Sequence, residues 1–342
     1  MSDKKLKVLV VRFSSIGDIV LTTPVVRGLK KQAGAEVHFL TKKAFCSLAQ
    51  SNPHIDRVYA IEKRVGEVLP ELRREQYDHI IDLHRNLRSG QVKRGLSAKS
   101  HSFRKLNLKK WLRVNLKVDR LPETHIVDRY LEPVRKLGVV ADGAGLDFPI
   151  PEGEHVDLNA LAKEAFPAEE YWRTRLGSGS YIGVVIGAAH ATKRLPPDML
   201  TELAGQLPKP LVLLGGPGDR ETGERIAGAV PGVLNTCGDF SLHGSASLID
   251  QSTGLITHDT GLMHIGAALK KRMVVVWGNT IPEFGMYPYD PAGTGTAVSF
   301  EVQGLRCRPC SKIGYQRCPK GHFACMRQQP LGQIARLAGS WL

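Results

Sequence analysis

Short apolar runs recur along the chain, and longer stretches that we interpret as helices, such as residues 20–33 and 66–76, separate them. The runs are nearly continuous in Val, Ile and Leu and do not alternate with polar residues. This pattern indicates strands that are covered on both faces and therefore parallel sheets. The predicted strands are residues 7–13, 35–41, 57–61, 79–84, 181–187, 210–216, 254–258 and 273–278.

The strand–helix pattern stops after four strands and restarts near residue 181. Residues 142–180, rich in Gly, Pro and acidic side chains, form the predicted connector. Two such units predict an α/β fold of two Rossmann-like domains whose parallel sheets face across a cleft, with ligands beyond the carboxyl ends of the strands. We place the first domain at residues 1–165, the second at 178–328 and a C-terminal helix at 329–342.

The first predicted strand runs into Ser14-Ser15-Ile16-Gly17-Asp18. Gly17 allows a tight turn, and the helix that follows presents free N–H groups at its start. Asp18 has two possible roles at this place. It can cap the helix, or it can serve as a general base at the mouth of the cleft, kept ionised by the helix terminus.

Two loops of the second domain have the composition of phosphate sites. Small residues, Gly187-Ala188-Ala189, precede Thr192-Lys193-Arg194, which favours phosphate contact over a merely solvated Lys-Arg pair. At the second loop, Asp259-Thr260-Gly261 opens a helix whose N–H groups can hold a phosphate, and His264 one turn later is either interior or ligand-facing. The turn at 215–222 lacks the Walker ending, which excludes a P-loop ATPase.

The chain is strongly basic, with a formal net charge of +14 and a pI near 9.6. Such an excess predicts an anionic partner. Residues 84–120 hold twelve Lys or Arg and one acidic residue, interleaved with Leu, Phe103 and Trp111. This stretch suits a surface that meets anionic lipid or a phosphorylated glycan. No nucleic-acid module accompanies it, so we expect no nucleic-acid partner.

The N-terminal apolar run stops at Arg12, which makes it too short for a signal peptide or a membrane span. We therefore expect a cytoplasmic protein with peripheral membrane contact at most. Six cysteines are present, and four of them follow a C-x2-C-x7-C-x6-C spacing that encloses His322. Because zinc ribbons usually carry two C-x2-C knuckles, this spacing favours reduced structural thiols over a structural zinc. The four are Cys307, Cys310, Cys318 and Cys325.

Five segments, taken in order, resemble the ADP-heptose:lipopolysaccharide heptosyltransferase family (glycosyltransferase family 9). They are SSIGDIVLTTPVVRGL, YDHIIDLHRNLRSG, GAAHATKRLP, GGPGDRE and THDTGLMHIGAAL, within roughly residues 6–325. Single pieces are weak, but the ordered set is specific. The resemblance implies a GT-B fold in which the first domain binds the acceptor and the second binds a nucleotide-sugar.

The resemblance also implies an activity. Family members transfer a heptose from an ADP-sugar, with inversion, onto the lipopolysaccharide core at the cytoplasmic face of the inner membrane, without a catalytic metal or other cofactor. The chain contains no Asp-x-Asp, the diphosphate–metal clamp of metal-dependent sugar transferases. Cations and helix termini must then stabilise the departing diphosphate.

The same resemblance assigns roles to single residues. Asp18 stands at the position of the catalytic base, and Lys193 at that of the lysine that contacts the donor phosphates. The D-T-G-x-x-H donor motif is matched by Asp259, Thr260, Gly261 and His264. The other expected donor contacts are Gly187, Thr192, Phe240 on the adenine, and Asp219 or Glu221 on the ribose. The expected acceptor contacts are Ser15, Gly17, His84, Asn86 and Arg88.

Two departures leave alternatives open. Where some heptosyltransferases carry a Thr-Thr pair before the lysine, this chain has Ala188-Ala189-His190-Ala191-Thr192, and Leu195 stands where several carry Trp. A family member with a different nucleotide-sugar is therefore one alternative. The other is a non-catalytic protein that binds an anionic glycan or lipid on the same scaffold.

Overall fold

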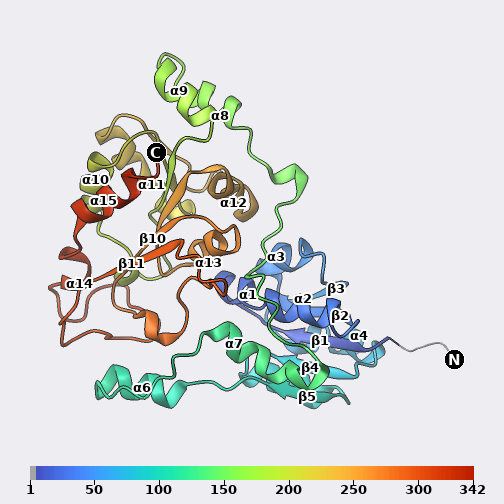
Figure 1. Ribbon diagram of the computed structural model, residues 1–342. Coiled ribbons are helices and arrows are strands. Elements are labelled where there is room, and N and C mark those ends of the chain that lie inside the picture. Colours follow the sequence, from blue (N-terminus) through green and yellow to red (C-terminus); the bar gives the residue numbers. More distant parts are fainter. Residues whose placement is uncertain (1–4) are drawn as a thin grey trace. The chain divides into compact units, whose positions relative to one another are not determined.

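The chain forms two compact units in the computed structural model, which describes residues 5–342 (Figure 1). The first unit holds the chain through Asn107, then Pro122–Pro149 and Pro291–Gly293. The second holds Leu108–Leu121, Ile150–Asp290 and Thr294–Leu342. Residues 150–165, which the sequence analysis placed in the first domain, thus lie in the second unit. None of the helices in residues 5–342 is both long and apolar enough to span a bilayer.

The sheet of the first unit has five parallel strands in the order β3-β2-β1-β4-β5. Four coincide with predicted strands, whereas β5 was not predicted because its sequence, KSHS, is polar and partly exposed at the sheet edge. The strands are β1 (Lys7–Val11), β2 (Glu36–Lys42), β3 (Arg57–Ile61), β4 (His79–Asp82) and β5 (Lys99–Ser102).

Helices of the first unit follow its strands. The helix predicted at 20–33 is shorter in the structure and begins at Thr23, with Pro24 in its first turn, where the missing N–H of proline loses no hydrogen bond. A separate short helix precedes it at Ile16–Val20. The helices are α1 (Ile16–Val20), α2 (Thr23–Lys31), α3 (Cys46–Gln50), α4 (Leu69–Arg74), α5 (Leu87–Gly95) and α7 (Ile126–Leu131).

The sheet of the second unit has six parallel strands in the order β11-β10-β9-β6-β7-β8. Both unpredicted strands, β8 and β11, lie at the edges. They lack a long apolar run: β8 is three residues long, and β11 is partly exposed. The strands are β6 (Ile182–Val185), β7 (Leu211–Leu214), β8 (Val233–Asn235), β9 (Gly254–His258), β10 (Met273–Trp277) and β11 (Ala297–Glu301).

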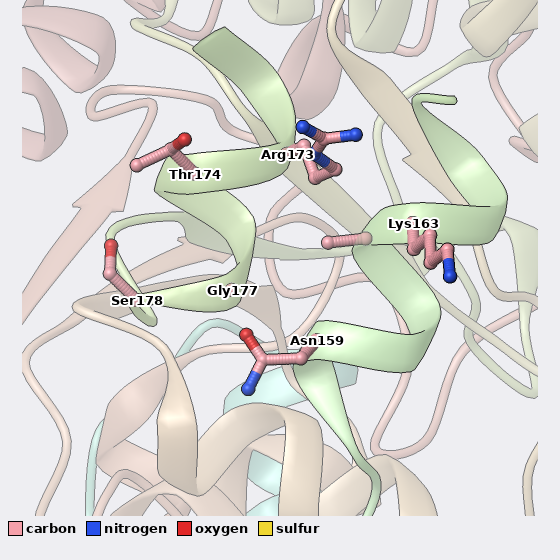
Figure 2. A pocket seen from close by; sticks show the side chains of 7 residues that line it. Asn159, Lys163, Arg173, Thr174, Gly177 and Ser178 are labelled. Carbon is pink, nitrogen blue, oxygen red and sulfur yellow. The ribbon is translucent and has the colours of Figure 1, made fainter. Parts of the chain in front are cut away.

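Two helices precede the first strand of this unit, within the predicted connector. α8 (Leu158–Ala165) and α9 (Glu170–Gly177) pack against each other, and an open cavity of about 600 Å³ lies between them (Figure 2). The remaining helices are α6 (Asn107–Asn115), α10 (Pro197–Gln206), α11 (Arg220–Ala229), α12 (Leu242–Gln251), α13 (Gly261–Ala268), α14 (Ala324–Arg327) and α15 (Leu331–Gly339).

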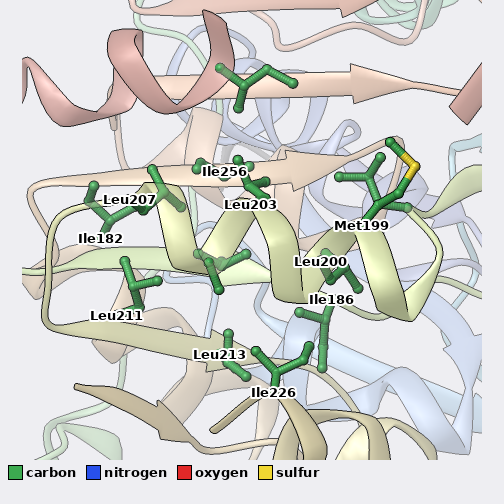
Figure 3. Close-up of a cluster of buried hydrophobic side chains, with 14 of the residues drawn as sticks. Ile182, Ile186, Met199, Leu200, Leu203, Leu207, Leu211, Leu213, Ile226 and Ile256 are labelled. Atoms are coloured by element: carbon green, nitrogen blue, oxygen red, sulfur yellow. The ribbon is translucent and has the colours of Figure 1, made fainter. Parts of the chain in front are cut away.

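The core of the second unit forms where α10 lies on β6 and β7. Its apolar residues, among them Met199 and Leu203, point at the sheet, and Leu207 just after the helix joins the same core (Figure 3). α15 packs beside α10 and adds Ile334 and Ala338 to the same core. The predicted C-terminal helix is therefore an integral layer of the second unit.

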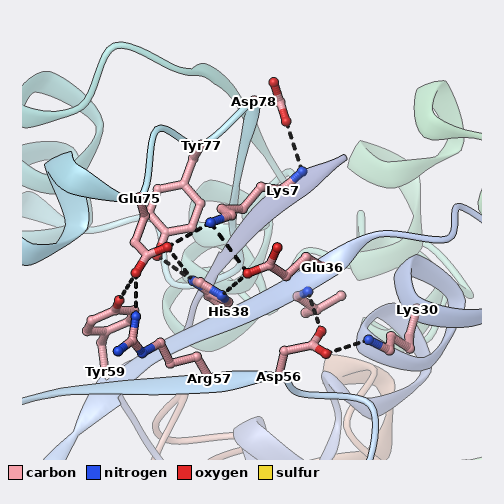
Figure 4. Close-up of polar contacts among 11 residues, drawn as sticks. Lys7, Lys30, Glu36, His38, Asp56, Arg57, Tyr59, Glu75, Tyr77 and Asp78 are labelled. Atoms are coloured by element: carbon pink, nitrogen blue, oxygen red, sulfur yellow. Dashed lines mark hydrogen bonds and ion pairs between the residues drawn. The ribbon is translucent and has the colours of Figure 1, made fainter. Parts of the chain in front are cut away.

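A polar cluster closes the amino-terminal edge of the first sheet (Figure 4). Glu75 accepts hydrogen bonds from Lys7 Nζ at 2.8 Å, Tyr59 Oη at 2.6 Å and Arg57 Nη1 at 2.5 Å. The bonds from Lys7 and Tyr59 lower the pKa of Glu75 from its ordinary 4.5 to about 2. The ionised carboxylate thus joins the starts of β1 and β3 to the chain after α4.

Acid is expected to weaken the first unit through Glu75. A carboxyl whose pKa is depressed on folding stabilises the protein above its unfolded pKa, and this contribution is lost as the pH falls through the folded pKa. We expect Glu75→Gln to be less stable than the parent near neutral pH, with the difference shrinking between pH 4.5 and about 2. Urea unfolding at several pH values measures this. Glu62→Gln, at an exposed pair with Lys43, is the matched control and should leave the pH profile unchanged.

Candidate functional site

The strand orders of both sheets place the candidate residues. In a doubly wound sheet, ligands bind beyond the carboxyl ends of the strands where the order reverses. In the first unit the reversal lies between β1 and β4, and in the second between β6 and β9. Asp18 follows β1 and His84 follows β4, whereas the Lys193 loop follows β6 and Asp259 follows β9. The predicted residues therefore follow the two strands at each reversal.

Asp18 lies in the first turn of α1, and both of its carboxylate oxygens are engaged. Oδ1 forms a salt bridge with Arg12 Nη2 at 2.6 Å, and Oδ2 accepts a hydrogen bond from Ser15 Oγ at 2.8 Å. Oδ2 also accepts the Ser15 N–H at 3.2 Å, so part of the capping role holds. The side chain keeps 20% of its surface exposed, so a ligand can still reach the carboxylate.

Arg12 is the residue of this site that the sequence analysis missed. Its guanidinium is buried, and Nη1 donates to the Leu83 carbonyl at 2.5 Å and to Tyr130 Oη at 2.8 Å. One side chain thus joins the ends of β1 and β4 to α7 and presents its remaining charge to Asp18. In the sequence, Arg12 only marks the end of an apolar run. The contacts of its guanidinium become known only from the fold.

The other residues of the first unit have differing surroundings. His84 packs edge-on against Phe13, with ring centroids 5.2 Å apart, and burial together with the charge of Arg12 lowers its pKa to about 4. Asn86 caps α5 by accepting the Ser89 N–H at 2.9 Å, which explains this residue without a ligand. Arg88 is exposed in the first turn of α5, and Gly17 is buried in α1.

The loop after β6 approaches the loop after β7 closely. Gly187 lies against Asp219, and a Cβ at position 187 would come within 2.1 Å of the Asp219 carboxylate. Asp219 accepts the Gly216 N–H at 2.9 Å and forms a salt bridge with Arg194 at 2.7 Å. Glu221, the alternative ribose ligand, is exposed in the first turn of α11. Asp219 is therefore the acid that the fold holds beside the β6 loop.

Lys193 and the D-T-G-x-x-H motif meet in the second unit. Lys193 Nζ lies 2.7 Å from Asp259 Oδ2, which also accepts a hydrogen bond from Thr280 at 2.8 Å. Thr260 is the N-cap residue of α13, and its buried Oγ1 has no hydrogen-bond partner among the described residues. Gly261 begins the helix, and His264 is buried one turn later. A cation, a helix start and an unsatisfied hydroxyl thus belong to one local structure.

Thr192 differs from its expected role, because it is buried beneath the loop. Its hydroxyl bonds to Asn279 Oδ1 at 3.0 Å and accepts the Tyr315 N–H at 2.8 Å. Through these bonds Thr192 fixes the backbone next to Lys193. His258 fixes the backbone two residues after Lys193, because its Nε2 accepts the Leu195 N–H at 3.0 Å. Burial lowers the pKa of His258 to about 4. Neither supporting contact has a sequence pattern that predicts it.

Phe240 lies just before α12, half-buried against the start of that helix. The cavity between α8 and α9 is lined by none of the predicted donor-binding residues. Its lining includes Asn159, Lys163 and Ser178, which precede β6 in the chain, whereas Gly187 and Lys193 follow the carboxyl end of β6. It is therefore not the site that the strand order predicts.

Two doubly wound parallel units, with charged groups beyond their strand ends, define an α/β protein of the Rossmann-like class. Residues 65–313 match the model of glycosyltransferase family 9 (heptosyltransferase), and the chain belongs to this family of glycosyltransferases. It is 25% identical over 306 residues to lipooligosaccharide heptosyltransferase 2 of Haemophilus influenzae, covering 82% of this chain and 85% of the relative.

Solved structures show the same fold. A glycosyl transferase family 9 structure from Veillonella parvula has a TM-score of 0.76 at 22% identity, covering 100% of this chain and 98% of the other. The E. coli ADP-heptose lps heptosyltransferase II has a TM-score of 0.65 at 21% identity, covering 97% and 100% of the two chains. The fold class expected from the sequence is confirmed, with parallel sheets in two Rossmann-like units.

The close approach of Gly187 to Asp219 gives a testable consequence. Gly187→Ala is expected to displace the Asp219 carboxylate from Gly216 and Arg194 and to lower the free energy of unfolding by about 1–3 kcal/mol, the usual cost of overpacking. Urea denaturation measures the change. Gly205→Ala in α10 is the control, because a Cβ there meets nothing within 4 Å, and it should be neutral or slightly stabilising. Equal stability of the two variants would contradict the packing argument.

Proposed function

We propose that this glycosyltransferase moves a heptose from ADP-heptose onto the inner core of lipopolysaccharide, with inversion and without a catalytic metal. The H. influenzae relative is named a lipooligosaccharide heptosyltransferase, and the E. coli structure an ADP-heptose heptosyltransferase. The observation that carries the proposal is the pair of strand reversals. At one, Asp18 is paired with a buried arginine, and at the other, Lys193 lies beside Asp259, just before a helix start.

Asp18 is the proposed general base. The acceptor hydroxyl gives its proton to the Asp18 carboxylate while its oxygen attacks the anomeric carbon of the heptose. The bond from that carbon to the diphosphate oxygen breaks, and ADP leaves with the electron pair. Because the attack and the departure occur on opposite faces of the carbon, a single displacement inverts the configuration. Arg12 orients the base through the 2.6 Å salt bridge.

The second unit supplies the proposed grip on the donor. Lys193 lies beside Asp259 and can turn its ammonium onto a diphosphate, while Gly261 offers a backbone N–H at the start of α13. The buried Thr260 hydroxyl has no protein partner in the described structure, which fits a phosphate oxygen as its acceptor. Asp219 and Phe240 complete the proposed contacts, with the ribose and the adenine respectively.

These groups replace the metal clamp in the proposal. The diphosphate gains negative charge as it leaves, and preorganised cations and N–H dipoles stabilise that charge most strongly in a water-poor site. The chain has no Asp-x-Asp at which a divalent ion would bind the diphosphate. We therefore propose that Lys193 and the start of α13 carry the electrostatic part of the reaction.

The acceptor is proposed to meet the first unit and the basic stretch at 84–120. Lipopolysaccharide cores carry phosphates and acidic sugars, which twelve basic side chains can attract. Leu108 and Trp111 of α6 are 70% and 49% exposed among these cations, as in segments that rest on anionic membranes. We propose peripheral contact with the cytoplasmic face of the inner membrane.

Replacement of the base tests the reaction. Asp18→Ala is expected to reduce transfer by at least about 10²-fold, the lower range for loss of a general base, while ADP binds as to the parent. ADP release from ADP-heptose and a deacylated core acceptor measures the rate, and calorimetry measures binding. Glu67→Gln is the matched control, because Glu67 also caps a short helix by accepting backbone N–H groups but lies outside the site.

The outcomes separate three cases. Loss of turnover in Asp18→Ala alone supports the base. Normal turnover in that variant contradicts the base assignment. A parent protein that binds the acceptor but never releases ADP contradicts the enzyme proposal and favours the glycan-binding alternative.

Removal of the cation tests the donor. Lys193→Ala is expected to weaken ADP binding about tenfold or more, because a charge-assisted contact to a diphosphate contributes roughly 1.5–3 kcal/mol. Lys163→Ala, an exposed lysine of the same unit, is the control.

Thermal shifts with ADP, UDP and GDP measure the nucleotide preference, since a ligand that binds only the folded state raises Tm. A preference for UDP or GDP would contradict an ADP-sugar donor.

A further inference from the structure

A row of contacts crosses the edge of the second sheet at which its strands end. The strands β11, β10, β9 and β6 are neighbours in that order. Arg308 lies in the loop after β11, and residues 278–280 follow β10. Asp259 follows β9, and Lys193 lies in the loop after β6. The contacts between these loops therefore lead from the edge strand β11 to the strand reversal between β9 and β6.

Arg308 begins this row, and its side chain is nearly buried, with 8% of its surface exposed. The guanidinium contacts three acceptors in three directions. Nη1 forms a salt bridge with Glu301 at 2.5 Å, Nε donates to the Gly278 carbonyl at 2.7 Å, and Nη2 donates to the Thr280 carbonyl at 2.8 Å. Glu301 is the last residue of β11 and lies in register with Trp277, the last residue of β10. The counter-charge of Arg308 thus belongs to the sheet itself.

The two carbonyls belong to the loop after β10, which is buried. Asn279 and Thr280 are each 1% exposed. A Cβ at Gly278 would come within 2.3 Å of the Thr192 carbonyl oxygen, so this loop lies directly against the loop after β6. Buried carbonyls that lose their hydrogen-bond donor are costly. Arg308 therefore fixes the main chain on both sides of Asn279.

The loop after β10 contacts Lys193 in two ways. Asn279 holds the main chain beside the lysine, because its N–H donates to the Thr192 carbonyl at 3.2 Å and its Oδ1 accepts the Thr192 hydroxyl at 3.0 Å. Thr280 holds the counter-ion of the lysine, because its hydroxyl donates to Asp259 Oδ2 at 2.8 Å. The same carboxylate oxygen lies 2.7 Å from Lys193 Nζ. Two adjacent residues thus fix both the backbone and the charge partner of Lys193.

We propose that Arg308 is a positioning residue for the donor diphosphate, and that it acts on Lys193 through the loop after β10. Arg308 itself contacts no substrate in this proposal. It determines where the ammonium of Lys193 lies before the donor arrives, and such preorganisation lowers the cost of ordering the site on binding. The inference rests on the proposed contact of Lys193 with the donor and adds the residue that orients it.

The geometry requires an arginine at position 308. A guanidinium presents its N–H groups in fixed directions of one plane, whereas the ammonium of lysine is a single point charge on a flexible stem. Arg308→Lys keeps a positive charge beside Glu301 but cannot donate to both carbonyls in the directions that the guanidinium uses. This substitution therefore removes the fixed geometry while it keeps the charge.

Tyr315, from the same segment after β11, gives Thr192 a second support. The Tyr315 N–H donates to Thr192 Oγ1 at 2.8 Å, and the Tyr315 carbonyl accepts the Thr192 N–H at 3.1 Å. These bonds hold Thr192 directly, whereas Asp259 is held through the Thr280 hydroxyl. Loss of the Arg308 contacts is therefore expected to disturb the charge partner of the lysine more than the fold of the loop after β6.

Binding of ADP to the purified chain tests the proposal. Arg308→Lys is expected to weaken ADP binding at least about threefold, within the range of coupling between residues of one network. Calorimetry measures the affinity, and circular dichroism with the urea midpoint shows whether the variant is folded. Arg306→Lys, at an exposed arginine of the same loop, is the matched control and should bind ADP as the parent does. Equal affinity of Arg308→Lys and the parent overturns the proposal.

A double-mutant cycle distinguishes positioning from a general loss of structure. If Arg308 acts through Lys193, Arg308→Lys should weaken ADP binding much less in the Lys193→Ala background than in the parent. An effect of the same size in both backgrounds overturns the proposal, because Arg308 would then act independently of the lysine. With ADP-heptose, Arg308→Lys should raise KM for the donor and leave KM for the acceptor unchanged. A rise for the acceptor alone also overturns it.

A second variant carries the test if Arg308→Lys does not fold. Thr280→Val removes the hydroxyl that holds Asp259 but keeps a β-branched side chain and leaves the Thr280 carbonyl bonded to Arg308. It should also weaken ADP binding, and unchanged affinity in this variant counts against the proposal in the same way.

Failure of this inference differs from failure of the proposed function. Unchanged ADP affinity in Lys193→Ala contradicts the proposed function, because the lysine then does not hold the donor. Unchanged affinity in Arg308→Lys beside a weakened Lys193→Ala overturns only the positioning role of Arg308.

Discussion

Parallel strands impose the constraint on which this protein depends. In an all-parallel sheet the strands end at one edge, and where their order reverses the connections leave in opposite directions and expose that edge. The chain meets this constraint twice, between β1 and β4 and between β6 and β9. Every charged residue proposed to act on a substrate follows one of these strands or a neighbour, so the topology gathers groups that lie far apart in the sequence.

The charges at these edges are held in pairs. Arg12 is buried and would be costly without a counter-charge, and Asp18 supplies it. Lys193 is paired with Asp259 in the same manner. Such pairing keeps both members of each pair oriented before a substrate arrives. A ligand can then bind by replacing the partner in the pair. Preorganisation of this kind is what electrostatic stabilisation of a leaving diphosphate requires.

The segment after β11 is part of the support of the site. A loop of small residues gives a phosphate access to the backbone, but it has few side chains with which to fix itself. Here Tyr315 and His258 hold the loop from beneath, through hydrogen bonds to Thr192 and Leu195. Through Tyr315, the segment after β11 thus supports the loop that bears Lys193.

The sequence by itself determined the eight apolar strands, the parallel α/β class and the strand-end positions of Asp18, Lys193 and Asp259, because burial on both faces leaves a continuous apolar run. It did not determine the polar edge strand β5, or that Thr192 faces inward. Nor did it reveal that Arg12 turns toward Asp18. Those features depend on contacts between residues distant in the chain, and only tertiary packing decides which side chain meets which.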